Sequence, residues 1–128
     1  MLDSDVCVEI IRGRGGPLHA YGDARLVISA VTRYELRVGA AKSRSRKGRQ
    51  RTGSFLEHTE TLEFGVTEAD RAGTLRAELE RTGRGIGPYD YLIAGHALSA
   101  GCALLTGNVE EFARVPGLEV LRWTHASR

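Results

Sequence analysis

Short apolar runs rich in β-branched residues alternate along the chain with stretches of helical periodicity, and this alternation constrains the fold more than any other feature. The predicted strands are a very short one ending at Asp3 and the runs 26–29, 61–64, 102–106 and 118–121. Strands that alternate with helices are typical of an α/β domain with a mostly parallel central sheet. A chain of 128 residues is long enough to bury one such core, so we expect a single domain over residues 1–128.

Polar residues and glycines predict where the helices begin and end. Thr32 followed by Glu35, and Thr67 followed by Asp70, fit the capping-box pattern of helix starts. A glycine-rich loop is expected from Gly13 to about Asp23. The predicted helices begin near Asp5, cover 31–40, form the second arm of a helical hairpin within 42–58, and begin again at Thr67 and at Pro88.

The composition is that of a soluble globular protein rather than a membrane protein. Apolar residues make up 41% of the chain and charged residues 27%, and no apolar run is long enough to span a bilayer. Asp3 and Asp5 stand where a signal peptide would carry basic residues, so we expect a cytoplasmic protein. Cys7 and Cys102 lack metal-ligand spacing and lie in apolar segments, which predicts reduced, buried thiols.

One segment concentrates positive charge although the net charge is only +2. The basic segment, residues 42–51, contains no acid and six basic residues: Lys42, Arg44, Arg46, Lys47, Arg49 and Arg51. Such a run is either a solvated helix face or a contact for nucleic-acid phosphates, and the sequence alone favours neither.

The stretch from Gly87 to Leu98 places one acid at the start of an otherwise apolar helix. Pro88 suits the first helical position, where its missing N–H costs nothing. Asp90 then falls in the first turn, where the helix dipole and unpaired N–H groups favour a carboxylate. We therefore expect Asp90 to be ionised near neutral pH.

Acidic side chains from separate segments are predicted to meet at one edge of the sheet. Asp3, Glu35, Asp90 and the turn 106–108 each follow a strand or begin a helix, and ligands of parallel sheets collect at the carboxyl ends of the strands. Three carboxylates repel one another unless a cation lies among them, and oxygen ligands favour Mg²⁺, or Mn²⁺, over zinc. Such an ion suits phosphodiester hydrolysis. His96 lies two turns into its helix and is expected to be a core or surface residue rather than a ligand.

These acids also have purely structural explanations. Asp3 and Asp5 together could cap a helix and occupy its first turn, and Glu35 could complete a capping box with Thr32.

Four segments resemble the successive motifs of PIN-domain proteins, specifically the VapC toxins of type II toxin–antitoxin pairs. They are residues 2–6, 28–39, 86–94 and 105–118, and the resemblance spans nearly the whole chain. It implies a three-layer α/β/α sandwich and a Mg²⁺-dependent endoribonuclease that cleaves single-stranded RNA. It also implies inhibition by a VapB-type antitoxin, a homodimer, and a hetero-oligomer with the antitoxin on operator DNA.

Carried over by position, the resemblance assigns Asp3, Glu35 and Asp90 as metal ligands. Asn108 stands where many family members have a fourth acid. Its amide can coordinate a cation or bind a water but removes one charge, and it could instead cap a helix beginning at Val109 with Glu111 as partner. The residues expected to support the ligands are Asp5, where the family often has Asn, Thr106, which matches a family hydroxyl, and Glu111.

The working hypothesis is a metal-dependent ribonuclease in which the basic segment guides RNA phosphates or docks an acidic part of the antitoxin. One rival is a PIN-like binding module with little turnover that acts with its antitoxin on operator DNA, and Asn108 is its support. A second rival is a phosphatase of the haloacid dehalogenase type, suggested by the Asp3-x-Asp5 pattern.

Overall fold

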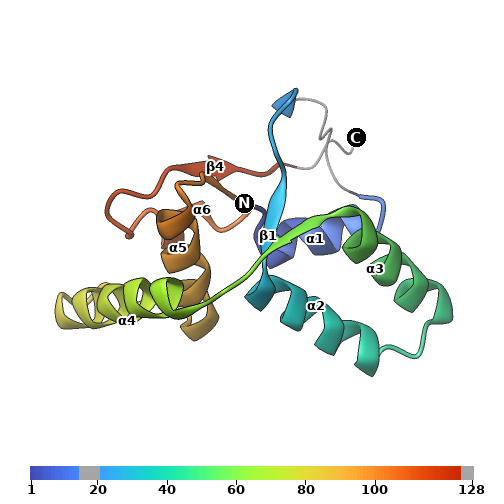
Figure 1. Ribbon diagram of the computed structural model, residues 1–128, viewed down its shortest axis with the longest axis horizontal. Coiled ribbons are helices and arrows are strands. Elements are labelled where there is room, and N and C mark those ends of the chain that lie inside the picture. The colour runs from blue at the N-terminus through green and yellow to red at the C-terminus, as the bar shows by residue number, and fades with distance from the viewer. Residues whose placement is uncertain (15–20, 125–128) are drawn as a thin grey trace.

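The structure is a computed structural model that describes residues 1–14 and 21–124. Six helices and four strands of three residues each form in this part of the chain (Figure 1). In chain order the elements are α1 Ser4–Ile11, β1 Val27–Ser29, α2 Ala30–Lys42, α3 Arg46–His58, β2 Glu60–Leu62, α4 Val66–Arg81, α5 Pro88–Ala100, β3 Leu104–Thr106, α6 Val109–Phe112 and β4 Val120–Arg122. The middle of the predicted loop 13–23, residues 15–20, lies outside the described residues.

The strands are parallel, and the N-terminal segment joins them into one layer. β1 pairs with β2, and β3 pairs with β4. Between these pairs, Leu2 forms a parallel bridge to Leu105 and donates its N–H to Val27 O at 2.8 Å. Asp3 N–H then donates to Leu105 O at 3.0 Å. The predicted strand at the N-terminus is therefore a single bridged residue that occupies the centre of the layer, and Asp3 leaves it at the carboxyl edge.

Alternating side chains divide the core into two clusters, as expected for a sheet buried on both faces. Val27 and Leu104 belong to the cluster covered by α4, α5 and α6, whereas their neighbours Ile28 and Leu105 belong to the cluster covered by α1, α2 and α3. The described residues thus form the predicted α/β/α sandwich.

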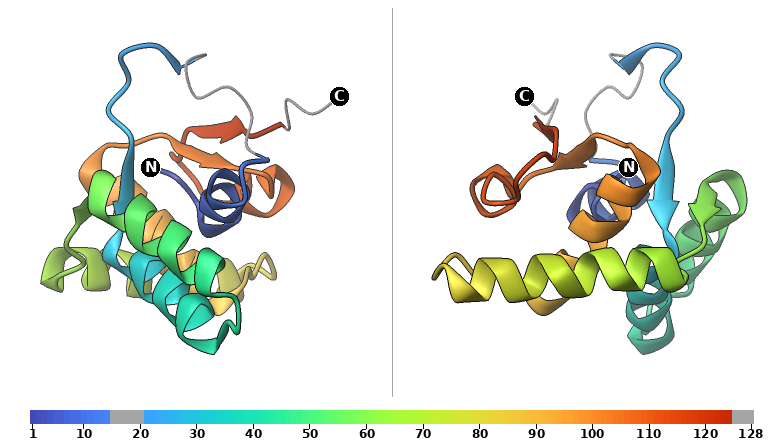
Figure 2. Two further views of the ribbon diagram at one scale, coloured as in Figure 1. Left: turned by 90° about the vertical axis from the view of Figure 1, so that its right-hand side faces the viewer. Right: turned by 60° about the vertical axis from the view of Figure 1, so that its left-hand side comes forward.

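One helical layer contains a close crossing of two helices, α4 and α5. In Figure 1, α2 and α3 form the predicted hairpin on one side, with α4 on the other. The right-hand view of Figure 2 shows α4 crossing α5. At this crossing a Cβ added to Gly95 of α5 would lie 2.7 Å from Ala72 Cα and 2.8 Å from Ala72 N. The absence of a side chain at Gly95 is what allows the two backbones to approach this closely.

Both predicted capping boxes are wrong. α2 begins earlier than expected, at Ala30, because Ser29 is its N-cap and accepts the Val31 N–H at 3.0 Å. α4 begins at Val66, and Glu68 accepts the Gly65 N–H at 2.7 Å, so Thr67 and Asp70 are ordinary helical residues. The predicted strands 26–29, 61–64, 102–106 and 118–121 are displaced or shortened to the bounds given above.

No helix among the described residues has the length and apolarity to cross a bilayer.

Candidate active site

Asp3 is a buried carboxylate at the carboxyl edge of the sheet. Only 6% of the residue is exposed. It is the N-cap of α1 and accepts the Ser4 N–H at 2.9 Å, which confirms its structural role. Its other oxygen, Oδ2, accepts the Thr106 hydroxyl at 2.8 Å. Burial raises the pKa of Asp3 to about 6 although the Thr106 hydrogen bond opposes that rise.

The turn after β3 holds its groups against the start of α1. Asn108 N–H donates to Thr106 Oγ1 at 3.0 Å, and Gly107 N–H donates to Asp5 Oδ2 at 3.0 Å. A Cβ on Gly107 would lie 2.7 Å from that Asp5 oxygen, so the carboxylate occupies space that only glycine leaves free. Thr106 thus contacts Asp3, and Asp5 contacts the turn after β3; their supporting roles stay predictions.

Glu35 has no capping role, because Ser29 rather than Thr32 caps α2. Its pKa is raised, first by burial and then by the charge of Asp3. The structural explanation for this acid is thus removed, and its side chain lies within electrostatic reach of the Asp3 carboxylate.

Asp90 lies in the first turn of α5, as predicted, with Gly87 as N-cap and Pro88 as the first helical residue. A Cβ on Gly87 would lie 2.8 Å from Asp90 Oδ2. Burial and a hydrogen bond with Glu111 raise the pKa of Asp90 to about 8, and the charges of Glu111, Asp3 and Glu35 add to the rise. The prediction that Asp90 is ionised near neutral pH is wrong, because burial and neighbouring acids outweigh the helix dipole.

Glu111 connects the start of α5 to the turn after β3. Its Oε1 accepts the Gly87 N–H at 2.5 Å and its Oε2 accepts Asn108 Nδ2–H at 2.6 Å. The Gly87 hydrogen bond lowers the pKa of Glu111, whereas the hydrogen bond with Glu111 contributes to the raised pKa of Asp90. Asn108 is the N-cap residue of α6, which begins at Val109 as the structural alternative expected, and its side chain bonds to Glu111 but makes no capping hydrogen bond to the helix backbone.

The acids share one electrostatic environment without meeting at ligand distance. Among the described residues, no three His, Cys, Asp or Glu side chains lie close enough to hold a metal ion together. No ion pair formed by these residues includes Asp3, Glu35 or Asp90. Burial is the largest cause of their raised pKa values, and the charges of neighbouring carboxylates add to it. An oxygen-only set of this kind fits a hard divalent cation such as Mg²⁺.

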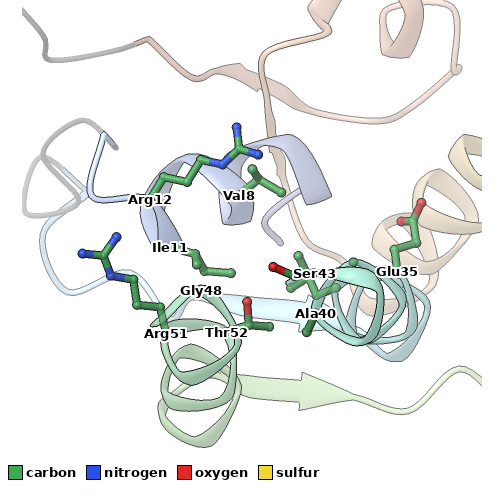
Figure 3. Close-up of a pocket in the computed structure, with 11 residues that line it drawn as sticks. Val8, Ile11, Arg12, Glu35, Ala40, Ser43, Gly48, Arg51 and Thr52 are labelled. Carbon is green, nitrogen blue, oxygen red and sulfur yellow. The ribbon is translucent and has the colours of Figure 1, made fainter. Parts of the chain in front are cut away.

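The basic segment lies at the end of α2 and along α3, and all six of its basic residues are exposed. Near it, a groove of about 250 Å³ runs between α1, α2 and α3. Figure 3 shows Glu35 at one end of this groove and Arg12 and Arg51 at the other. Val8, Ile11 and Leu36 contribute its apolar lining. The groove thus connects one candidate ligand, Glu35, with the positive charges of Arg12 and Arg51.

His96 and the two cysteines take no part in this site. His96 is 2% exposed, hydrogen-bonds through Nδ1 to Ser29 Oγ at 2.8 Å, and is a core residue as predicted. Both thiols are free; Cys7 is buried, whereas Cys102 is only partly buried. Burial raises the pKa of the Cys7 thiol, which makes it unreactive.

Four residues around the acids were not predicted to have a role there. Gly87 and Gly107 leave room for the Asp90 and Asp5 carboxylates; Gly87 lies three residues before Asp90, whereas Gly107 is far from Asp5 in the sequence and gave no local signal. Tyr34 and Tyr89 form an exposed ring pair with centroids 6.1 Å apart. The signal for this pair was a tyrosine directly before each of two candidate ligands.

The family described as "PIN domain" matches residues 1–118. The chain therefore belongs to the PIN-domain family. This finding overturns the phosphatase hypothesis, because the Asp3-x-Asp5 pattern now lies within a PIN domain.

Relatives identify the group within that family. The chain is 36% identical to "tRNA(fMet)-specific endonuclease VapC" of Salmonella typhimurium over 96% of both chains, and 35% identical to the protein of the same name from Shigella flexneri over 97% of both. Among solved structures, DNA-bound VapBC from Salmonella typhimurium matches with a TM-score of 0.87 at 36% identity over 97% of both chains. VapBC2 from Rickettsia felis, bound to a promoter DNA fragment, matches with a TM-score of 0.86 at 32% identity, over 97% of this chain and 98% of that one. Within the PIN family, the protein is a ribonuclease of the VapC group.

Proposed function

We propose that the protein is the Mg²⁺-dependent endoribonuclease toxin of a type II toxin–antitoxin pair and that Asp3, Glu35 and Asp90 hold the ion. The metal site is supported most strongly by the placement of these carboxylates, whose negative charges repel one another and form no ion pair with a basic side chain of the described residues. A divalent cation relieves this repulsion, and Mn²⁺ has the same ligand preference. Asp3, Glu35 and Asp90 would hold the ion through their carboxylate oxygens.

A bound Mg²⁺ would lower the pKa of a water molecule and offset negative charge on the phosphate. The chain's own residues prepare the site for it. The Thr106 hydroxyl donates a hydrogen bond to Asp3 and holds that side chain in place. Glu111 accepts the Gly87 N–H, which fixes its side chain, and it also hydrogen-bonds to Asp90. Asn108 supplies an amide rather than a fourth charge beside Glu111.

The substrate is single-stranded RNA, held by the basic segment. The groove between α1, α2 and α3 supports this route because it joins Glu35 to Arg12 and Arg51. Contacts between RNA phosphates and the basic end of the groove would orient the strand toward the acids. The names of the Salmonella and Shigella relatives make initiator tRNA the first RNA to test.

The partner is a VapB-type antitoxin in the cytoplasm, with which the toxin, itself a homodimer, binds operator DNA. The support is that the structures matched from Salmonella typhimurium and Rickettsia felis are VapBC complexes bound to DNA. We treat residues 1–128 as one domain in this assembly.

The test is cleavage of an RNA panel, including initiator tRNA, by the purified chain freed of antitoxin, with Mg²⁺ and with EDTA. Cleavage in Mg²⁺ alone is expected, and Asp90→Asn should abolish it while the circular dichroism spectrum stays unchanged. Glu110→Gln is the matched control, because Glu110 is exposed on α6 beside the site. Equal cleavage by Asp90→Asn and wild type would refute the proposal that Asp90 holds the ion.

A further inference from the structure

Two tyrosine rings from different helices meet on the surface beside the acids. Tyr34 of α2 is 54% exposed and Tyr89 of α5 is 44% exposed. Their ring centroids lie 6.1 Å apart with the planes inclined at 39°, and their hydroxyl oxygens are 3.5 Å apart. The two rings therefore form one continuous aromatic surface, the tyrosine platform, that bridges α2 and α5.

The tyrosine platform borders the proposed metal site. Tyr34 directly precedes Glu35, and Tyr89 directly precedes Asp90. Each ring therefore comes from the same helical turn as one of these two acids.

Chemistry limits what can bind at this position. The acids repel phosphates, and the basic segment lies on α3 and the end of α2 rather than between the tyrosines. Affinity for RNA here must come from contacts that do not depend on charge. Exposed aromatic faces supply such contacts by stacking on nucleobases, which are the neutral and planar part of the strand.

We infer that Tyr34 and Tyr89 form a stacking site for one nucleobase of the RNA, adjacent to the phosphate held at the acids. The inference rests on the proposed function for the position of the strand. It assigns the tyrosines to holding the substrate rather than to the chemical step. Stacking accepts every base and is strongest for purines, so the platform contributes affinity and a modest purine preference.

The test measures binding without cleavage. Fluorescence anisotropy in EDTA gives the Kd of the full chain for labelled oligo-A and for an abasic ribose-phosphate oligomer of the same length. Tyr34→Ala and Tyr89→Ala should each weaken oligo-A binding about tenfold and leave abasic binding unchanged. Tyr34→Phe and Tyr89→Phe, which keep the ring, should bind oligo-A as the wild type does. Val66→Ala removes another exposed apolar side chain, 79% exposed on α4, and should change neither Kd.

Three outcomes would overturn the stacking site. The first is an unchanged oligo-A Kd in both alanine variants, and the second is an equal loss of abasic binding, which would point to the backbone. The third is conversion of a wild-type dimer to monomers by either alanine variant in sedimentation, which would make the surface a contact between copies. Failure of the proposed function is distinguishable, because the ring-dependent oligo-A binding would persist in a chain that cleaves no RNA.

Discussion

Replacing Asp90 by Asn should stabilise the metal-free protein even though it abolishes activity. The folded state raises the pKa of Asp90 from 3.8 to about 8. When folding raises the pKa of an acid, the protein loses stability as the pH increases from the acid's pKa in the unfolded chain to its pKa in the folded chain. Wild type therefore loses stability across this range, and an Asn side chain, which cannot ionise, does not. Asn can still donate a hydrogen bond to Glu111, as the protonated Asp90 does.

The magnitude follows from the size of the shift. One pKa unit corresponds to about 1.4 kcal/mol. At pH 7 the raised pKa of Asp90 therefore lowers the free energy of unfolding of the wild type by at most about 4 kcal/mol. Two effects reduce this loss of stability. The Asp90 side chain is partly exposed to water, and the lowered pKa of Glu111 stabilises the folded state. We expect Asp90→Asn to increase the free energy of unfolding by about 1 to 3 kcal/mol near pH 8.5 and by less near pH 5.

Urea unfolding in EDTA, followed by circular dichroism near pH 5 and near pH 8.5, measures this difference. Glu110→Gln should match wild type at both pH values, because Glu110 is exposed on α6. The reasoning fails if Asp90→Asn is no more stable than wild type near pH 8.5, or if its advantage is larger near pH 5.

Two further predictions concern packing and the Asp3 hydrogen bond. Gly95→Ala should destabilise the protein by about 2 kcal/mol or more in thermal unfolding, because its Cβ would lie 2.7 Å from the Ala72 backbone. Gly73→Ala, exposed in α4 with nothing within 4 Å, should instead stabilise it by about 0.5 to 1 kcal/mol, and equal effects at both sites would contradict the close α4–α5 crossing. Thr106→Val removes the hydroxyl that lowers the pKa of Asp3, so the pH profile of RNA cleavage should move upward by about one unit; an unmoved profile would refute this.

The sequence predicted the layers of the fold better than the bounds of its elements. Alternation of apolar runs and helical patterns identified the parallel sheet, because both faces of each strand must be apolar. Strand register depends on the partner strand: Leu104 pairs with Val120, so β4 is 120–122 rather than the apolar run 118–121. A short strand's own residues do not specify that pairing.

The helix starts show the same limit. Ser29 and Thr32 both offer a hydroxyl for capping α2, and the choice depends on where β1 ends. Once β1 ends at Ser29, the chain turns there and Thr32 becomes a buried helical residue. Local pattern identified the helix but not its first residue.

The acids of the site were predicted individually, whereas their electrostatics were not. Asp90 has an ordinary first-turn position, and its helix alone would keep it ionised. Its pKa instead depends on Glu111, which contacts Gly87 from 24 residues away in the chain. Such long-range neighbours have no local signal in the sequence.

Calorimetric titration of Mn²⁺ into the antitoxin-free chain tests the central claim most directly, because it measures the ion without requiring a substrate. Wild type should bind about one Mn²⁺ per chain with release of protons, since cation binding requires an ionised Asp90. Asp3→Asn and Asp90→Asn should show no saturable binding, and Glu110→Gln should bind as wild type does. Undiminished Mn²⁺ binding by Asp90→Asn, or no saturable binding by wild type, would contradict the proposed metal site.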